Sequence, residues 1–392
     1  MRYSTVTDQI AGLGSDKWIL NAAAQKRTKA GHPVINLTIG EPDVPTPAEL
    51  IETATAAMRA GRTTYSNGRG EDSLLDALSR RYTTRLNRPF GHERFLCLPG
   101  TQTSLYLVFR SLCEAGCEVI VGDPMYAVYE GIIRASGATP VPVQLRPEQN
   151  FRLQAADVAE KITPATRVIF INTPHNPTGA ILQPAELRAL GELARAHDLW
   201  IVSDEVYGDL THGGRPFTSA LADPDFEDRT VVTASISKSH AAPGFRSGWA
   251  AGPAEFTKRA LPLSETMLFG SQPFIADMTA QAVASEPVLA RGMAERMARR
   301  AQILFDRLDG VAGLRVHRPE AGMFALIDIR ALSQDSLGFA LELLEQTDVA
   351  MMPGASFGAG LEGWLRVALN ASDALTEEAC ARIAAYAMQK AA

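Results

Sequence analysis

Three clusters of polar residues follow three apolar runs in the middle of the chain, and their residue types suit catalysis. The first cluster spans residues 172–179, the second 203–207 and the third 235–238. In an open α/β sheet, ligands bind outside the carboxyl ends of the strands. We therefore expect the three clusters to meet in one cleft.

Lys238 and Asp204 have the strongest chemical implications within these clusters. A lysine that is partly desolvated in a cleft has a lowered pKa, so its amine can attack carbonyl carbons and carry protons. A carboxylate such as Asp204 is costly to bury unless it faces a cation, for example a protonated ring nitrogen. The pair suits an aldehyde that carries a heterocyclic ring.

Two further segments are suited to a phosphate. Arg246 offers a rigid fork of N–H donors. Gly100-Thr101-Gln102 lies where a predicted strand ends and a helix begins, so its backbone N–H groups and the helix dipole favour an anion. A reactive lysine, a carboxylate for a ring nitrogen and a phosphate cup are the requirements of pyridoxal 5'-phosphate, an electron sink for carbanions.

The elements that must position these residues alternate between strand and helix from about residue 95 to residue 252, as βαβ units do. The predicted helices include Thr101–Ala115, which Gly116 would end, and Pro184–His197. The predicted strands are Phe95–Leu98, Glu118–Val121, Arg167–Ile171, Trp200–Val202, Val231–Ala234 and Gly248–Ala251. This alternation predicts an α/β fold with a mostly parallel central sheet flanked by helices.

A second, smaller α+β domain is expected from the residue pattern after residue 281. A long Ala-, Arg- and Glu-rich helix runs to Leu308, and short strands follow near Leu314–Val316 and Met323–Ile329. The first 35 residues, helical over Trp18–Ala30, are expected to pack on this domain. The predicted division is a large domain over residues 36–280 and a small domain made of residues 1–35 and 281–392.

The composition excludes several classes of protein. The 392 residues are 46% hydrophobic and 21% charged, close to the globular average. The net charge of -6 offers no general attraction to nucleic acid or to an anionic membrane, and no apolar run approaches the ~18 residues of a membrane span. The N-terminus lacks the apolar stretch of a secretory signal, so we expect a cytoplasmic protein. No spacing of His and Cys residues indicates a metal site.

Two short motifs match known functional patterns, but the sequence around them does not support those functions. Residues 358–363 fit GxGxxG, but a strand is predicted at Trp364–Leu369, where the dinucleotide fingerprint requires a helix. Residues 354–358 fit GxSxG, yet the last histidine is His317, before the serine, whereas that hydrolase fold places its histidine after the serine.

The chain resembles the class I/II aminotransferases of the fold-type I pyridoxal phosphate family. The matching residues cover nearly the whole chain in the expected order: Ile39-Gly40-Glu-Pro-Asp, Tyr65, Gly100-Thr-Gln, Asp123-Pro-Met-Tyr126, Asn176-Pro-Thr-Gly, Asp204-Glu-Val-Tyr207, Ser235-Ile-Ser-Lys238 and Arg366. The resemblance implies a homodimer with active sites at the interface, in which Tyr65 reaches the phosphate of the neighbouring subunit.

The resemblance also implies a role for each matched residue. Lys238 would form an aldimine with the cofactor and then move the proton released from the substrate, while Asp204 would keep the ring nitrogen protonated. Arg366 would bind the substrate α-carboxylate, with Gly40 allowing its close approach. The other cofactor contacts would be Tyr207 and Asn176 at the ring oxygen, Tyr126 on the ring face, and Ser235, Ser237, Arg246, Gly100, Thr101 and Gln102 towards the phosphate.

The reaction implied is transfer of an amino group from an L-amino acid to a 2-oxo acid, through a pyridoxamine form of the cofactor. The chain is most similar to arginine:pyruvate transaminases, through residues 1–4, 196–200, 238–241 and 267–271. Aspartate or aromatic amino acid aminotransferases are the first alternative. A carbon–sulfur lyase is the second, because the bond cleaved depends on an orientation that sequence does not show.

Two further considerations concern residues around this framework. His240, Pro243 and Ser247 depart from the family pattern beside the lysine, where they could tune access or specificity. Some chains of this fold act as ligand sensors of transcription regulators, but only about 35 residues precede the first motif, too few for a DNA-binding domain.

Overall fold

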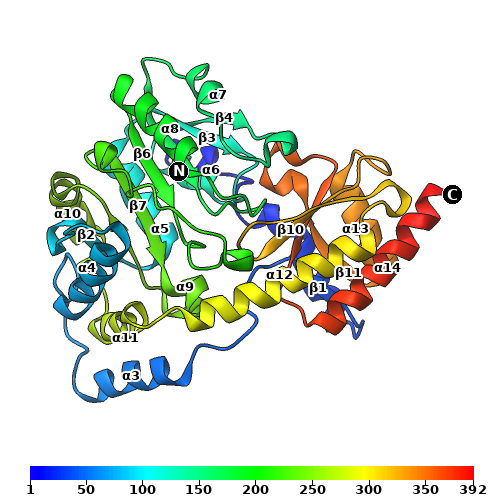
Figure 1. Ribbon diagram of the computed structural model, residues 1–392, viewed down its shortest axis with the longest axis horizontal. Coiled ribbons are helices and arrows are strands. Elements are labelled where there is room, and N and C mark those ends of the chain that lie inside the picture. The colour runs from blue at the N-terminus through cyan, green and yellow to red at the C-terminus, as the bar shows by residue number, and fades with distance from the viewer.

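A seven-stranded sheet forms the larger half of the molecule (Figure 1). The computed structural model describes the backbone of residues 1–392 and the side chains of residues 1–14 and 17–392. The strand order is β2-β8-β7-β6-β5-β3-β4, and only β8 runs antiparallel to its neighbours. The strands are β2 Phe95–Leu98, β3 Glu118–Asp123, β4 Thr139–Gln144, β5 Thr166–Asn172, β6 Trp200–Asp204, β7 Thr230–Ser235 and β8 Gly248–Ala251.

Helices cover both faces of this sheet because its strands are apolar on both sides. In β2, for example, Phe95 and Cys97 belong to one buried cluster and Leu96 and Leu98 to another. One face is covered by α5 Gly100–Leu112, α6 Tyr129–Ala135 and α10 Ala254–Leu268, and the other by α4 Asp72–Leu86 and α8 Pro184–Ala196. The short helices α7 Ala155–Ala159 and α9 Ile236–Ser239 follow β4 and β7, while α3 Ala48–Arg59 and α11 Pro273–Ala284 pack together beside α4.

A five-stranded sheet forms the other half, with the order β1-β11-β12-β10-β9. Its strands are β1 Ile35–Leu37, β9 Arg315–His317, β10 Phe324–Asp328, β11 Val349–Pro353 and β12 Trp364–Ala368. Its helices are α2 Ile19–Lys29, α12 Val288–Leu308, α13 Ser336–Thr347 and α14 Asp373–Ala391. The long helix α12 runs from beside α9 to the far side of this sheet (Figure 1).

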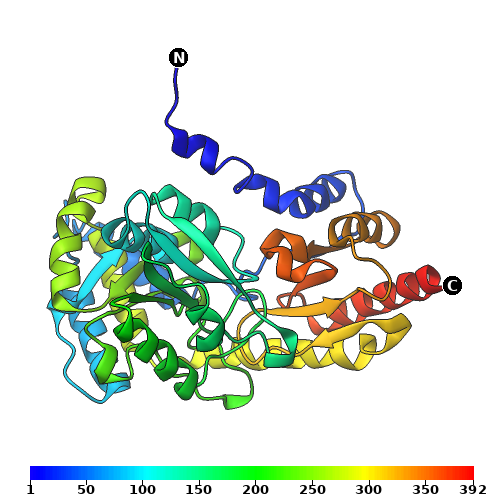
Figure 2. The same ribbon diagram turned by 90° about the horizontal axis from the view of Figure 1, so that it is seen from above.

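The N-terminal segment crosses the outside of the molecule (Figure 2). Its helix α1, Thr5–Gln9, contacts α6 beside the larger sheet, whereas α2 packs against β11 of the smaller one. The strand β1 pairs in parallel with β11, so the predicted boundary at residue 36 falls inside a strand of the smaller sheet. We still propose two domains, but we place the first boundary after Leu37, because β1 belongs to the smaller sheet.

Within the larger half, α5 and β4 differ from the sequence-based expectation. Helix α5 ends at Leu112 rather than at Ala115, because Cys113 is already extended and Gly116 belongs to a separate turn. The edge strand β4 was not predicted, since Pro140 and Pro142 within it are typical of a non-strand segment. A proline is accepted there because an edge strand needs only one of its two sides paired.

The carboxyl ends of β5, β6 and β7 lie side by side. The register pairs Asn172 with Asp204, and Asp204 with Thr233. The polar clusters that follow these three strands therefore begin at the same edge of the sheet. No helix in the described part of the chain is both long enough and apolar enough to cross a membrane.

The backbone packs closely where β8 passes the start of α5. A Cβ atom at Gly248 would lie 2.7 Å from the carbonyl oxygen of Ala234 and 2.9 Å from Cα of Gly100. Both of these atoms belong to the backbone, so neither can rotate away.

We expect Gly248→Ala to lower the free energy of unfolding by about 1–3 kcal/mol, because β7 or α5 must shift to admit the methyl group. Urea denaturation measures this change. Gly244→Ala is the matched control, since nothing lies within 4 Å of its built Cβ and its φ is not positive. Equal stability of Gly248→Ala and wild type would contradict the close packing described.

Candidate active site

A cavity of about 220 Å³ lies at the carboxyl ends of β5, β6 and β7 and extends to the five-stranded sheet. It brings together most of the residues singled out from the sequence. Those that line it are Gly40, Thr101, Gln102, Tyr126, Asn176, Asp204, Tyr207, Ser235, Ser237, Lys238, Arg246 and Arg366. Gly100 lies directly behind this lining, and Tyr65 lies elsewhere on the surface.

Lys238 enters the cavity from the short helix α9, which begins where β7 ends. The Ser235 side chain caps this helix by accepting a hydrogen bond from the Ser237 N–H. Lys238 Nζ donates a hydrogen bond of 2.8 Å to the Gly40 carbonyl. Burial lowers the pKa of Lys238 to about 8, and Arg366 and Arg246 act in the same direction against the opposing charge of Glu41. An amine with this pKa can release and accept a proton near neutral pH.

Asp204 ends β6 and is 4% exposed. One carboxylate oxygen accepts a 2.7 Å hydrogen bond from the Tyr129 hydroxyl, and the other accepts one of 3.1 Å from the Val206 N–H. Burial raises the pKa of Asp204 to about 6, while these two hydrogen bonds oppose the rise. A cation that binds against this carboxylate therefore stabilises its charged form.

Aromatic and amide side chains form the walls around Asp204. Tyr126 packs edge-on against Tyr129, with 5.4 Å between ring centroids, and burial raises the pKa of its hydroxyl. Burial also raises the pKa of Tyr207. Asn176 is held by its neighbour Asn172, whose side-chain oxygen accepts a hydrogen bond of 2.8 Å from the Asn176 N–H.

The opposite end of the cavity is rich in N–H and O–H groups. A Cβ atom at Gly100 would lie 2.3 Å from Nη2 of Arg246, so the guanidinium lies directly against the first residue of α5. Thr101 follows at the N-terminus of α5, and its hydroxyl oxygen is buried without a hydrogen-bond partner among the described residues. Together with Ser235 and Ser237, these groups form a cup suited to a dianion such as phosphate.

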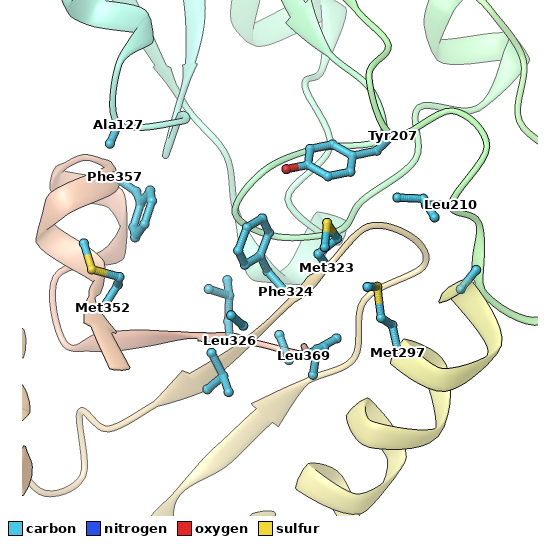
Figure 3. Packing of buried hydrophobic residues seen from close by; sticks show 14 of the residues in the cluster. Ala127, Tyr207, Leu210, Met297, Met323, Phe324, Leu326, Met352, Phe357 and Leu369 are labelled. Carbon is cyan, nitrogen blue, oxygen red and sulfur yellow. The ribbon is translucent and has the colours of Figure 1, made fainter. Parts of the chain in front are cut away.

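Arg366 comes from β12 of the smaller sheet and is 1% exposed. Its two Nη atoms donate to the Thr38 carbonyl at 2.6 Å and to the Asn176 side-chain oxygen at 3.2 Å. The rings of Phe324 and Phe357 lie 3.9 and 4.2 Å from its guanidinium carbon. Figure 3 shows Phe324 between Phe357 and Tyr207, at the border of the two halves.

The electrostatics of Arg366 are those of a binding site for a carboxylate. Burial lowers its pKa, yet a guanidinium stays protonated in proteins. No salt bridge reaches it from the described residues, and its Nε has no hydrogen-bond partner there. A buried and unpaired cation of this kind gains most from an anionic ligand.

Tyr65 is the predicted site residue that the structure does not bring to the cavity. It is 86% exposed and packs edge-on against Phe269, with 4.9 Å between ring centroids. Its implied role at the phosphate of a neighbouring subunit stays a proposal. The strand β12 directly follows the GxGxxG match at residues 358–363, as expected when the motif was set aside as a dinucleotide fingerprint.

Sequence reasoning missed several residues that shape the site. Tyr129 was detectable, because it lies three residues after Tyr126 and ends up beside it. Phe324 and Phe357 left no signal, since their contact with Arg366 depends on how β10, β12 and the loop after β11 come together. The sequence also gives no signal for the role of the Thr38 carbonyl, because every residue has a backbone carbonyl.

The combined arrangement can hold one anion at the cup beside α5, a second at Arg366 and a cationic ring at Asp204, and it supplies one amine of lowered pKa. These are the requirements for proton transfer at a carbon next to an amino group and a carboxylate.

A model of the family "aminotransferase class I and II" matches residues 32–383. The arginine–pyruvate transaminase AruH of Pseudomonas aeruginosa is 39% identical over 389 residues, which cover 99% of each chain. An aspartate aminotransferase of Geobacillus stearothermophilus is 32% identical over 86% of this chain and 87% of the relative.

Two solved structures of aminotransferases have the same fold as this chain. The aspartate aminotransferase of Rhizobium meliloti superposes with a TM-score of 0.93 at 26% identity over 99% of both chains. The aspartate aminotransferase of Thermus thermophilus with maleate gives 0.90 at 29% identity, over 98% of this chain and all of that one. The predicted fold and the resemblance seen in the motifs are thus confirmed, and the chain belongs to the class I and II aminotransferases.

Proposed function

We propose that this protein is a pyridoxal 5'-phosphate-dependent aminotransferase that moves the amino group of an L-amino acid to a 2-oxo acid. The observation that carries this proposal is the meeting of Lys238, Asp204 and Arg366 in one buried cavity. Asp204 comes from β6 of the seven-stranded sheet, Lys238 from the helix α9 and Arg366 from β12 of the five-stranded sheet. Such a convergence suits one ligand that is reactive, cationic at its ring and anionic at its carboxylate.

The residues present fit the cofactor. The unpartnered Thr101 hydroxyl, Arg246 and the N-terminus of α5 would hold the phosphate, with Ser235 and Ser237 beside them. Asp204 would face the ring nitrogen, and Asn176 and Tyr207 would hold the ring oxygen. Tyr126 would cover one face of the ring.

Bound in this way, pyridoxal 5'-phosphate supplies an electron sink for the electron pair left at the substrate Cα when a proton is removed. Arg366 holds the substrate α-carboxylate and so fixes the orientation of Cα. Lys238 Nζ takes the proton from Cα and holds it for return, which its lowered pKa permits. Asp204, held in place by Tyr129 and Val206, stabilises the positive charge at the ring nitrogen.

The charges around the cavity favour a basic amino acid as donor. Four of its five charged lining residues already have roles in this scheme, namely Asp204, Lys238, Arg246 and Arg366. The fifth is Glu41, an exposed carboxylate beside Gly40 that would attract a cationic side chain. Together with the 39% identity to an arginine–pyruvate transaminase, this supports arginine as donor and pyruvate as acceptor.

We also propose that the protein is a homodimer. Tyr65 and Phe269 form an exposed aromatic pair that is 86% and 62% exposed, and Met267 nearby is 41% exposed. Exposed apolar side chains of this size that lie together are typical of an interface between subunits. In such a dimer, Tyr65 would take the role that the family resemblance implies for it, at the phosphate of the neighbouring subunit.

The half-reaction tests the proposed activity. Cofactor-loaded protein mixed with single amino acids, without any 2-oxo acid, should form about one equivalent of 2-oxo acid per site and then stop. A carbon–sulfur lyase would instead release product continuously.

Lys238→Ala should reduce the rate by about a thousandfold or more, because it removes the proton carrier. Product assays by chromatography measure both, and full activity in this variant would overturn the assignment.

Glu41 provides a test of donor class. We expect Glu41→Gln to raise the KM for arginine roughly five- to tenfold, since one exposed charge pair contributes about 1 kcal/mol. The KM for alanine should not change, because its side chain carries no charge. Glu52→Gln on α3 is the control for a loss of negative charge away from the cavity. Equal effects on arginine and alanine would argue against a cationic side chain at this position.

Asp204 should make the stability of the cofactor-free protein depend on pH. Its pKa is about 6 in the folded state and near 3.8 in the unfolded state, so the folded state binds more protons between these values. Stability from this group is therefore fully present below about pH 4 and is lost as the pH rises through 6, by as much as about 3 kcal/mol.

Asp204→Asn should remove this dependence. The difference in unfolding free energy between Asp204→Asn and wild type should grow in favour of the variant from pH 4 to pH 6 and then level off. Urea denaturation at each pH measures it, and the comparison cancels the contribution of other buried groups such as Glu205. A difference that is constant with pH would mean that Asp204 is not desolvated in the folded protein.

A further inference from the structure

The segment that follows β1 provides acceptors for both buried cations of the active site. The Thr38 carbonyl accepts from Arg366 at 2.6 Å, and the Gly40 carbonyl accepts from Lys238 at 2.8 Å. The group proposed to bind the substrate carboxylate and the group proposed to take the proton from Cα are thus both positioned against the same short piece of backbone. A displacement of this segment would move both of them.

Regular secondary structure does not hold this segment in place. The strand β1 ends at Leu37, and α3 begins only at Ala48. Between them, the backbone of Ile39 to Asp43 is held mainly by side chains, such as the Asn370 amide, which donates to the Ile39 carbonyl at 3.0 Å. The space around Gly40 is also tight, because a Cβ there would lie 2.2 Å from the ring of Phe324.

The main attachment of the segment is Asp43, whose side chain is 4% exposed. Arg296 binds its two carboxylate oxygens through Nε and Nη2, at 2.7 and 2.8 Å, and Arg300 adds a third hydrogen bond of 2.8 Å. Burial alone would raise the pKa of Asp43, but the hydrogen bonds from the two arginines hold it below its usual value. We call Asp43, Arg296 and Arg300 the Asp43 cluster.

Arg300 connects this cluster to the strand that carries Arg366. It is 5% exposed, and its Nη1 also donates to the Leu369 carbonyl at 2.9 Å, directly after β12. Its Nε donates to Asp373 at 3.0 Å, at the start of α14. Both arginines lie on α12, so one rigid helix binds the end of the segment after β1 and the end of β12 at the same place.

We propose that Asp43, Arg296 and Arg300 are positioning residues for the substrate carboxylate, which fix the Thr38 and Gly40 carbonyls relative to Arg366 and Lys238. None of the three lines the cavity. The proposal rests on the proposed function, since it assumes that Arg366 binds a carboxylate. Loss of the cluster should then weaken the binding of carboxylate ligands and leave the phosphate end of the cavity intact.

Calorimetric titration of the cofactor-loaded protein tests this inference. The probes are 5-guanidinopentanoate and 4-phenylbutanoate, which carry a carboxylate but no amino group and so cannot react with the cofactor. Asp43→Asn should raise the Kd of both probes by at least about tenfold, because it removes the carboxylate that holds Arg296 and one of the two, Asp43 and Asp373, that hold Arg300. The Kd of the cofactor should stay within about threefold of wild type.

Turnover provides a second measurement. In Asp43→Asn, the KM of the donor and that of the 2-oxo acid should rise by similar factors, with kcat within about threefold of wild type. The control is Arg307→Gln, at the end of α12, which breaks an exposed pair with Glu377 of α14 and should change neither value. If Asp43→Asn does not fold, Arg296→Lys can be used instead. It replaces the bidentate contact with Asp43 by a single hydrogen bond, so the KM of the donor and the KM of the 2-oxo acid should rise by a smaller factor.

The outcomes separate this inference from the proposed function. Unchanged probe affinity in Asp43→Asn would overturn the positioning role and leave the proposed aminotransferase unaffected. Equal losses of probe and cofactor affinity would also overturn it, because they would indicate a general structural role. If neither probe binds the wild type, Arg366 is not a carboxylate site, and both proposals are wrong.

Discussion

A guanidinium buried between two sheets is the interaction on which this active site depends. Arg366 belongs to the five-stranded sheet, yet it hydrogen-bonds to Asn176 from a loop of the seven-stranded sheet. Phe324 and Phe357 cover it, and no carboxylate of the described residues pairs with it. Burial of an unpaired charge costs several kcal/mol, so the fold must offset this cost through packing elsewhere. What the site gains is an arginine whose Nε has no partner among the described residues, so that the guanidinium can bind a ligand carboxylate while the Thr38 carbonyl still holds it.

The sequence allowed most of the larger sheet and one end of the site to be predicted. Parallel strands that are buried on both faces read as continuous apolar runs, and Asp204, Ser235 and Asn172 mark where three of them end. The edge strand β4 escaped prediction because its two prolines are typical of loops, and β1 and β11 were not predicted either. The roles carried over from the family resemblance concern single side chains, which sequence motifs preserve. Tyr129 and the phenylalanines around Arg366 act through contacts between distant elements, and such contacts have no local pattern.

The charges of the cavity are separated along its length in a way that assigns each end a partner. The phosphate cup at α5 and the guanidinium at β12 are both positive, Asp204 is the buried carboxylate of the cavity, and the amine of Lys238 is close enough to Arg366 and Arg246 for their charges to lower its pKa. The same cations that bind the anionic groups of the ligand therefore tune the base that acts on it. Burial is the main cause of the lowered pKa of Lys238, and the charges of these cations add to it.

The helix α12 extends between the two halves of the molecule and carries Arg296 and Arg300. It has 21 residues, and at 1.5 Å per residue it spans about 32 Å, from the neighbourhood of α9 to the far side of the smaller sheet. Arg296 and Arg300 are four residues apart and so project from the same side of this rod. One inserted residue upstream would turn everything beyond it by about 100° and carry both arginines out of reach of Asp43. The helical register of α12, which contributes no residue to the cavity lining, thus determines whether Arg296 and Arg300 reach Asp43.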